Sequence, residues 1–173
     1  MSENKYFDHP AREIFLEMLQ KELTRLLLLA SVAFFIGLGL TAYFLTRNIY
    51  LASIGLGLVI LGTYLFVIWS RIGVPENAPI YKTLKFNPTE IVWVYTLKVE
   101  IMPFGIKLFR RDYLTFKFIS GKEETIPVHC TKCLVLENWL KRVLPFATFG
   151  YSHERLKTFQ EDPSKLKKDN LSF

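Results

Sequence analysis

The chain has 173 residues, half of which are hydrophobic, and it carries a formal net charge of +6 at pH 7. That length accommodates one helical hairpin and one small domain of roughly 90 residues. The sequence has no glycine-rich phosphate loop before a soluble helix and neither a G-x-S-x-G nor an H-E-x-x-H motif. We therefore expect neither hydrolytic nor phosphoryl-transfer chemistry, and the protein is not expected to be an enzyme.

Residues 1–25 are expected to form an amphipathic N-terminal helix. Pro10 suits the first helical position, because its missing N–H would be unpaired there in any residue. The apolar side chains recur at helical spacing, at Ala11, Ile14, Phe15, Met18 and Leu19. Such a helix lies at the lipid headgroups or against a cytoplasmic domain. The alternative is a solvated extension of the helix that follows.

Residues 26–70 are expected to form a transmembrane hairpin of two helices. Residues 26–45 and 49–69 contain no charged side chain, and each run has the roughly 20 residues that cross a bilayer core. Each run carries about a dozen Leu, Ile, Phe and Val residues, each of which favours insertion by about 0.3–0.6 kcal/mol at the helix centre. A buried helical pair in a soluble protein is the alternative, but soluble helices are rarely apolar around their whole circumference.

Four glycines suggest how the two spans pack. Gly37 and Gly39 lie in the first span, and Gly55 and Gly57 lie in the second. If the hairpin turns at Arg47, Gly37 is level with Gly57 and Gly39 is level with Gly55. Small residues let membrane helices approach closely, so all four glycines are predicted to lie at the helix contact.

The basic residues near the spans predict the orientation. Only Arg47 lies in the turn between the spans, whereas the outer flanks are more basic, with Lys5, Arg12, Lys21 and Arg25 before the first span and Arg71, Lys82 and Lys85 after the second. Positive residues stay on the cytoplasmic side. We therefore expect a multi-pass protein of the cytoplasmic (inner) membrane with both termini in the cytoplasm. The two cysteines are compatible with this location, because the reducing cytoplasm keeps thiols free of disulfide bonds.

Residues 79–163 are expected to form a cytoplasmic α+β domain, followed by a polar tail over residues 164–173. Apolar and polar side chains alternate over residues 93–101, as in a half-buried strand, and shorter strands are predicted over residues 106–110, 113–119 and 124–128. A helix should end at Pro145, and its apolar side is expected to contain Leu134, Leu136, Trp139, Leu140, Val143 and Leu144. A second helix should run from Ser152 to before Pro163. The predicted fold class is a membrane α-helical hairpin plus a bent antiparallel sheet capped by a C-terminal helix, which is a pleckstrin-homology-like (PH-like) architecture.

Several short motifs resemble those of small bacterial two-span membrane proteins with a PH-like cytoplasmic domain of the YcxB-like kind. The resemblance covers about residues 25–163. It lies in Ile91-Val92-Trp93-Val94-Tyr95, the turn at Gly105, Gly121-Lys122, Ile126-Pro127, Leu144-Pro145 and Phe149-Gly150-Tyr151-Ser152. It implies a fold and a membrane location, and it brings no set of catalytic residues and no phosphoinositide ligand.

Two groups of residues are candidates for chemistry or binding. Cys130 and Cys133 form a C-x-x-C motif, which is compatible with a redox pair or half of a zinc site shared by a dimer, but ordinary packing at a strand-to-helix junction is favoured. We accordingly expect no cofactor and no metal. A basic patch for an anionic headgroup or a protein partner is predicted at Lys107, Arg110, Arg111 and Lys117, against the alternative of a solvated sheet face of mixed charge.

These observations predict a non-enzymatic membrane protein that presents a binding or scaffolding domain. Trp93, Tyr95 and Phe109 are candidate exposed anchors, although most of the three are expected to form the core. The expected partners are the lipid bilayer and either another protein or a second copy of the chain, and not nucleic acid. The alternative is an accessory or immunity subunit of a membrane complex that makes its contacts through the hairpin. A third hypothesis is a small redox enzyme that uses Cys130 and Cys133.

Overall fold

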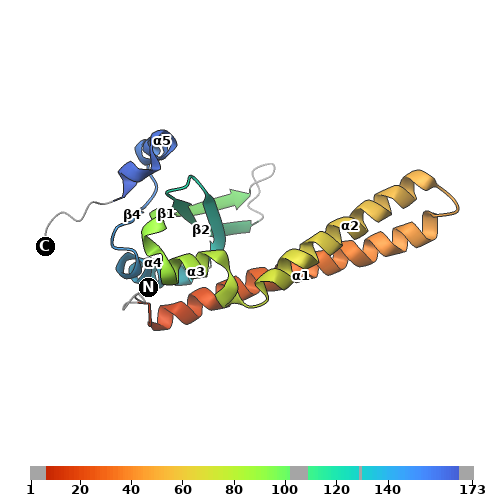
Figure 1. The fold of residues 1–173 in the computed structure, drawn as a ribbon, viewed down its shortest axis with the longest axis horizontal. Coiled ribbons are helices and arrows are strands. Elements are labelled where there is room, and N and C mark those ends of the chain that lie inside the picture. Colours follow the sequence, from red (N-terminus) through yellow and green to blue (C-terminus); the bar gives the residue numbers. More distant parts are fainter. Residues whose placement is uncertain (1–6, 102–108, 129, 168–173) are drawn as a thin grey trace, which may run out of the picture. The chain divides into compact units, whose positions relative to one another are not determined.

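The computed structural model describes residues 7–101, 109–128 and 130–167 (Figure 1). The chain forms two compact units. The hairpin unit is Leu19–Asn77, and the sheet unit combines Met1–Met18 with Ala78–Phe173. The first helix, α1 (Pro10–Phe44), contributes to both units, so the sheet unit is assembled from two stretches of sequence.

The hairpin unit contains the long part of α1 and the whole of α2 (Ile49–Ile72). Both helices are long and apolar enough to cross a membrane. Only 11% and 17% of their most apolar windows are buried, so most of this apolar surface faces outward, unlike that of core helices in soluble proteins. Asn48 begins α2 as its N-cap, and its side-chain oxygen accepts hydrogen bonds from the backbone N–H groups of Tyr50 and Leu51.

Three of the hydroxyl groups within the hairpin are satisfied by their own helices. Ser31 donates to the carbonyl of Leu27, Thr41 to that of Gly37 and Thr63 to that of Val59, at 2.8–2.9 Å. A hydroxyl bonded in this way needs no water, so these polar residues are compatible with a hydrocarbon environment.

Close packing of the two hairpin helices depends on three glycines. A Cβ atom added to Gly37 would lie 2.7 Å from the carbonyl oxygen of Gly55 and from the backbone nitrogen of Val59. A Cβ atom on Gly55 would lie 2.7 Å from the backbone nitrogen of Thr41, and one on Gly62 would lie 2.7 Å from that of Phe34. Real Cβ contacts are essentially never this short, so these positions accept only glycine at this helix separation.

The prediction that four glycines form the contact is therefore wrong for two of them. Cβ atoms added to Gly39 and Gly57 would meet nothing within 4 Å. The predicted pairing of glycines across the hairpin is also wrong, because Gly37 faces Gly55 rather than Gly57. The reason is helical geometry: residues two apart differ by about 200° around a helix, so Gly37 and Gly39 cannot share a face.

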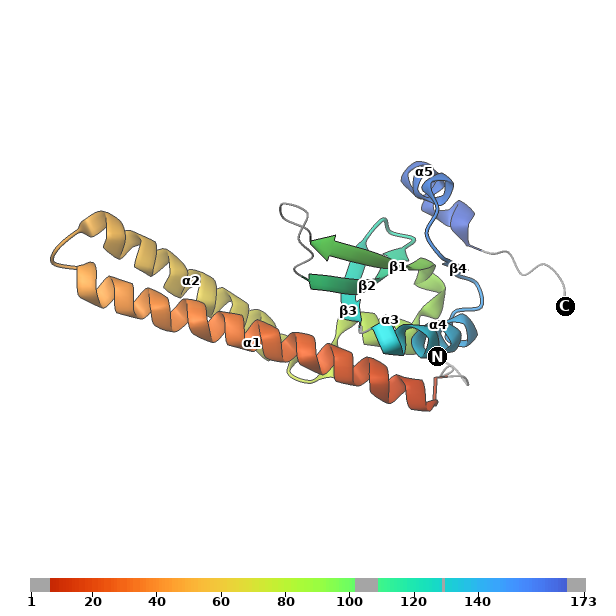
Figure 2. The ribbon, with the colours of Figure 1, turned by 180° about the vertical axis from the view of Figure 1, so that it is seen from behind.

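The sheet unit contains a four-stranded sheet with helices on both sides (Figure 2). The sheet comprises β1 (Ile91–Ile101), β2 (Phe109–Phe118), β3 (Glu123–Val128) and β4 (Thr148–Phe149), in the spatial order β3-β2-β1-β4. The helices of this unit are the start of α1, α3 (Pro79–Phe86), α4 (Cys130–Val143) and α5 (His153–Glu161), and 3-10 turns occur at Pro88–Glu90 and Pro163–Leu166. A further 3-10 turn, Pro75–Asn77, ends the hairpin unit.

The sheet is mixed rather than purely antiparallel. β1 pairs antiparallel with β2, and β2 with β3, but β4 runs parallel to β1 through the pairs Trp93↔Thr148 and Val94↔Phe149. The expectation of an antiparallel sheet is wrong at this edge. In addition, β2 is continuous through Arg111, where a break between two strands was predicted. A two-residue strand such as β4 is too short to show any periodicity in sequence.

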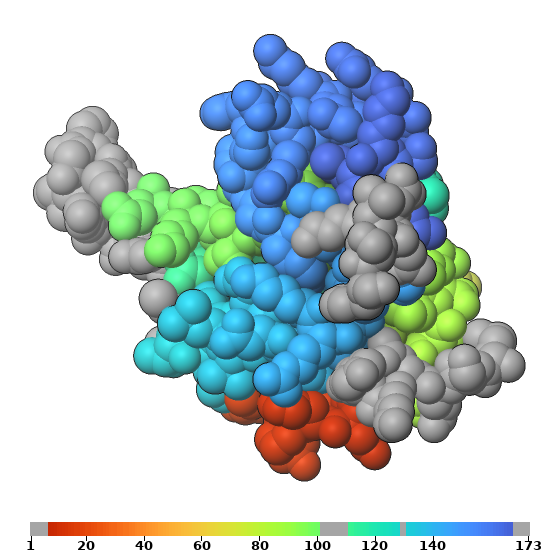
Figure 3. All heavy atoms as spheres, turned by 90° about the vertical axis from the view of Figure 1, so that its left-hand side faces the viewer, coloured from red at the N-terminus to blue at the C-terminus, as the bar shows by residue number. Residues whose placement is uncertain are grey.

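One face of the sheet packs against helices that include the start of α1. The Phe15 side chain is fully buried, with its ring centre 6.2 Å from that of Phe116 and 5.8 Å from that of Trp139 on α4. Phe7 contacts Tyr81 of α3 and Trp139. At the surface, the Lys132 ammonium lies 2.6 Å from the Glu17 carboxylate. The start of α1 (red) accordingly adjoins α4 (cyan) in Figure 3.

The opposite face of the sheet is covered at one end by the C-terminal segment. Trp93 and Tyr95 of β1 form a buried cluster with Phe159 of α5 and with Leu166. The sequence alternation predicted a half-buried β1, but Ile91–Tyr95 are all buried because both faces of this half of the strand are covered. Trp93 and Tyr95 are therefore core residues and not exposed anchors. The side chain of Phe109 lies outside the described residues.

Candidate functional site

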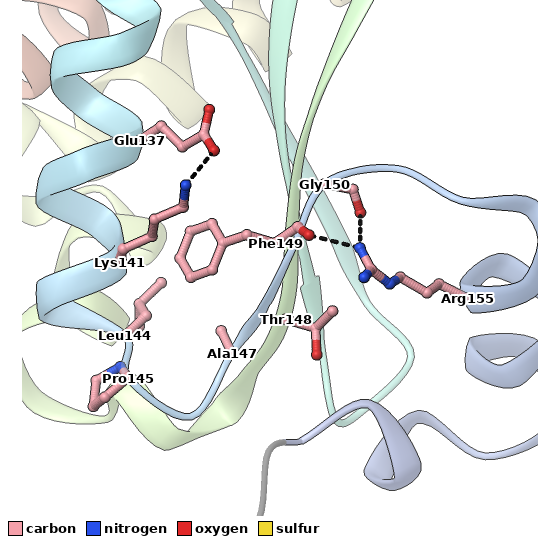
Figure 4. A pocket seen from close by; sticks show the side chains of 9 residues that line it. All are labelled: Glu137, Lys141, Leu144, Pro145, Ala147, Thr148, Phe149, Gly150 and Arg155. Carbon is pink, nitrogen blue, oxygen red and sulfur yellow. Dashed lines mark hydrogen bonds and ion pairs between the residues drawn. The ribbon is translucent and has the colours of Figure 1, made fainter.

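One pocket of the sheet unit lies where α4, β4 and α5 meet (Figure 4). We call it the β4 pocket, and its volume is about 390 Å³. Its lining combines apolar side chains with two cations and one carboxylate. The lining residues are Glu137, Lys141, Leu144, Pro145, Ala147, Thr148, Phe149, Gly150 and Arg155.

Short-range sequence signals place these elements around the pocket. α4 ends at Val143, two residues before Pro145, and the chain then turns into β4. Gly150 has a φ of +88°, a left-handed conformation that favours glycine, and it lets the chain leave β4 towards α5. Ser152 is the N-cap of α5, and its hydroxyl accepts a hydrogen bond from the N–H of Glu154.

Arg155 reaches back from α5 and fixes the turn after β4. Its Nη1 donates to the carbonyl oxygens of Phe149, at 2.6 Å, and of Gly150, at 2.9 Å. The Gly150 carbonyl also accepts a hydrogen bond from the buried indole of Trp93, at 2.8 Å. Carbonyl groups orient the guanidinium but do not neutralise its charge. Across the part of the chain that the structure describes, no carboxylate forms an ion pair with Arg155.

The other two charges of the pocket belong to α4. The Lys141 ammonium lies 2.8 Å from the Glu137 carboxylate, one helical turn away, and 5.9 Å from the ring centre of Phe149. Both partners of this pair are substantially exposed, so the pair contributes at most about 1 kcal/mol. Two cations and one carboxylate leave the pocket with a net positive charge, and its chemistry is suited to binding an anionic group beside an apolar wall.

An aromatic cluster supports the turn between β4 and α5. The ring of Tyr151, which is 44% exposed, stacks on Trp93 with an interplanar angle of 17° and contacts Tyr95. Burial raises the pKa of Tyr95 to about 12, and the nearby Glu123 carboxylate and Tyr151 add to this shift, while a hydrogen bond with Thr115 opposes it. The Tyr95 hydroxyl therefore stays neutral at physiological pH. Tyr151 is the exposed aromatic residue of this region.

The structure keeps two residues of the predicted basic patch apart, Lys117 and Arg111. Lys117 is buried, forms an ion pair with Glu123 and lies 5.0 Å from the ring centre of Phe159. Arg111 is exposed six residues away on β2, about 20 Å along the strand. Lys107 and the side chain of Arg110 lie outside the described residues. Lys117 thus has a structural role, and the prediction that it contributes to a surface patch is wrong.

The C-x-x-C motif lies in the first turn of α4. The Cys133 side chain is half-buried, whereas the side chain of Cys130 lies outside the described residues. No cluster of three or more His, Cys, Asp or Glu side chains suited to a metal occurs among the described residues. A metal or redox role of this motif stays a prediction.

Sequence reasoning did not identify the β4 pocket, because its residues come from three elements joined by a two-residue strand. The available signals were the helix-ending Pro145 and the Ser152 cap, which mark the turns on each side of β4. Comparison of the chain with models of protein families, with curated proteins and with solved structures finds no match in any of the three.

Proposed function

We propose that this protein is an integral membrane protein whose hairpin unit anchors a binding or scaffolding module, the sheet unit. The observation that carries the proposal is the large outward-facing apolar surface of α1 and α2, which is compatible with a lipid environment. The sheet unit supports the second part, because it has its own core and a cationic pocket. We assign no reaction to it.

The proposed location is the cytoplasmic membrane, with both termini and the sheet unit in the cytoplasm. Arg47 is the single basic residue of the turn, whereas Arg12, Lys21, Arg25 and Arg71 flank the outer ends of the spans. This distribution supports the orientation through the positive-inside rule. A relation of the sheet unit to PH-like domains remains part of the proposal, and it rests on the sequence resemblance alone.

A second candidate function is that of an accessory or immunity subunit that contacts its partner through the hairpin. One observation favours it: the hairpin unit has an apolar groove of about 310 Å³ beside the contact made by Gly62. Its walls are three phenylalanines, Phe34, Phe35 and Phe66, and its other lining residues are small. Grooves lined by small residues accept a neighbouring membrane helix.

Site-specific photocrosslinking in living cells separates the two functions. Benzoylphenylalanine replaces Phe149 in the β4 pocket, Phe66 in the hairpin groove or the exposed Phe86 of α3 as a matched control. The binding-module proposal predicts a discrete adduct from position 149 that position 86 does not give. An adduct from position 66 alone supports the subunit function, and identical results at all three positions contradict the proposed function.

A further inference from the structure

We infer that the β4 pocket binds a phosphoryl group of a small organic phosphate or of a phospholipid headgroup. This inference rests on the proposal that the sheet unit is a binding module, and it names the chemistry of its ligand. Two cations, Lys141 and Arg155, line the pocket from two different helices, and one carboxylate, Glu137, accompanies them. The excess of positive charge selects an anion.

Arg155 is oriented before any ligand arrives. Its Nη1 is held by the carbonyl oxygens of Phe149 and Gly150, and the remaining N–H groups of a guanidinium are available as donors in a fixed plane. A donor whose rotamer is already fixed loses little entropy when it binds an anion. The hydrogen-bond partners of Arg155 in the described structure are carbonyl oxygens, so no carboxylate among the described residues competes with an incoming anion for the guanidinium.

Lys141 is the adjustable cation of the pocket. Its ion pair with Glu137 is weak because both side chains are substantially exposed, so an incoming anion replaces it at small cost. A phosphoryl group has three or four oxygens that point in different directions, so it can accept hydrogen bonds from donors on more than one side. A carboxylate has only two oxygens in one plane, and it fits a single guanidinium better than two separated cations.

The size and walls of the pocket indicate an organic phosphate. The pocket volume of about 390 Å³ leaves room for more than one phosphoryl group. The remaining wall is apolar and includes Leu144, Ala147 and the ring of Phe149. A phosphate ester with a short carbon chain or ring matches both parts of this lining.

The test uses the full-length protein in a non-ionic detergent at constant ionic strength. Binding of inorganic phosphate, of dihexanoyl phosphatidylglycerol and of acetate is measured by isothermal titration calorimetry. The variants are Lys141→Gln and Glu137→Gln, with Arg142→Gln as the matched control, because Arg142 is an exposed neighbour that does not line the pocket. Arg155 is left unchanged, since it also supports the turn after β4.

We expect saturable phosphate binding that Lys141→Gln weakens about tenfold or more and that Arg142→Gln changes less than about twofold. Glu137→Gln should tighten binding, because it releases Lys141.

Tighter binding of the short-chain lipid than of inorganic phosphate identifies a headgroup as the source, and the reverse identifies a soluble phosphate. Equal effects of Lys141→Gln and Arg142→Gln, or acetate binding as tight as phosphate binding, would overturn the inference. If an adduct from position 149 persists in that case, the binding module stands and only its ligand class is wrong.

Discussion

Phe15→Ala is expected to destabilise the sheet unit by about 3–5 kcal/mol, although Phe15 lies more than 60 residues before the first strand. The side chain is fully buried between Phe116 of β2 and Trp139 of α4, so its removal leaves a cavity in the core. Alanine is a good helix former, so α1 itself is not weakened. The measurement is urea unfolding of the full-length protein in a non-ionic detergent, followed by tryptophan fluorescence.

Phe86→Ala provides the matched control for this experiment. It makes the same chemical change in the same unit, but the Phe86 side chain is 43% exposed and should cost less than about 1 kcal/mol. If Phe15→Ala and Phe86→Ala lower the free energy of unfolding equally, the start of α1 is not part of the core. A corollary is that a fragment beginning at residue 78 lacks an essential part of its core.

The second large effect concerns the hairpin glycines. Gly37→Ala and Gly62→Ala are each expected to lower the stability of the hairpin by about 1–3 kcal/mol, because the new methyl group meets backbone atoms of the other helix at 2.7 Å. Backbone atoms cannot rotate away as a side chain can, so the helices must move apart and lose their contact. The measurement is the thermal unfolding midpoint of the purified protein in detergent.

Gly39→Ala and Gly57→Ala are the controls, since a Cβ atom at either position has nothing within 4 Å. They introduce the same methyl group into the same helices, and alanine favours a helix over glycine. We expect their midpoints to equal or exceed that of the wild type. Equal losses for all four substitutions would show that the helices do not pack through Gly37 and Gly62.

Composition alone predicted the two long apolar helices, because about 20 consecutive apolar residues have few other stable environments. Local periodicity also predicted β1, β3, α4 and α5 to within a few residues, since each has either alternating burial or a clear end signal such as Pro145 or Ser152. The apolar face of residues 11–19 was also visible in the sequence. Its partner was not, because the contact of Phe15 with Trp139 joins residues more than 120 positions apart.

The glycine contact shows a different kind of error, one that helical geometry alone could have avoided. Gly55 and Gly62 are seven residues apart, which is about two turns, so they share a face of α2. Gly57 lies about 200° from Gly55 and must point elsewhere. The prediction paired glycines that lie at the same distance from Arg47 along the two helices. It did not take into account how side chains rotate around a helix, and it did not include Gly62.

The β4 pocket could not be predicted from local patterns. Its strand has two residues, and its position at the sheet edge depends on parallel pairing with β1, more than 50 residues earlier in the chain. The sequence also could not show that Lys117 is buried rather than part of a surface patch. Its ion pair with Glu123 forms only when β2 and β3 pair.

The central claim is that the chain crosses a membrane twice and turns at Arg47 on the side opposite its termini. It is tested by placing a single cysteine at Arg47→Cys in a Cys130→Ser, Cys133→Ser background and treating intact spheroplasts with a membrane-impermeant maleimide. The account predicts labelling of residue 47 in intact spheroplasts, and no labelling of a Lys5→Cys variant until the membrane is permeabilised. Labelling of residue 47 only after permeabilisation, or recovery of the protein in the aqueous fraction without detergent, would contradict it.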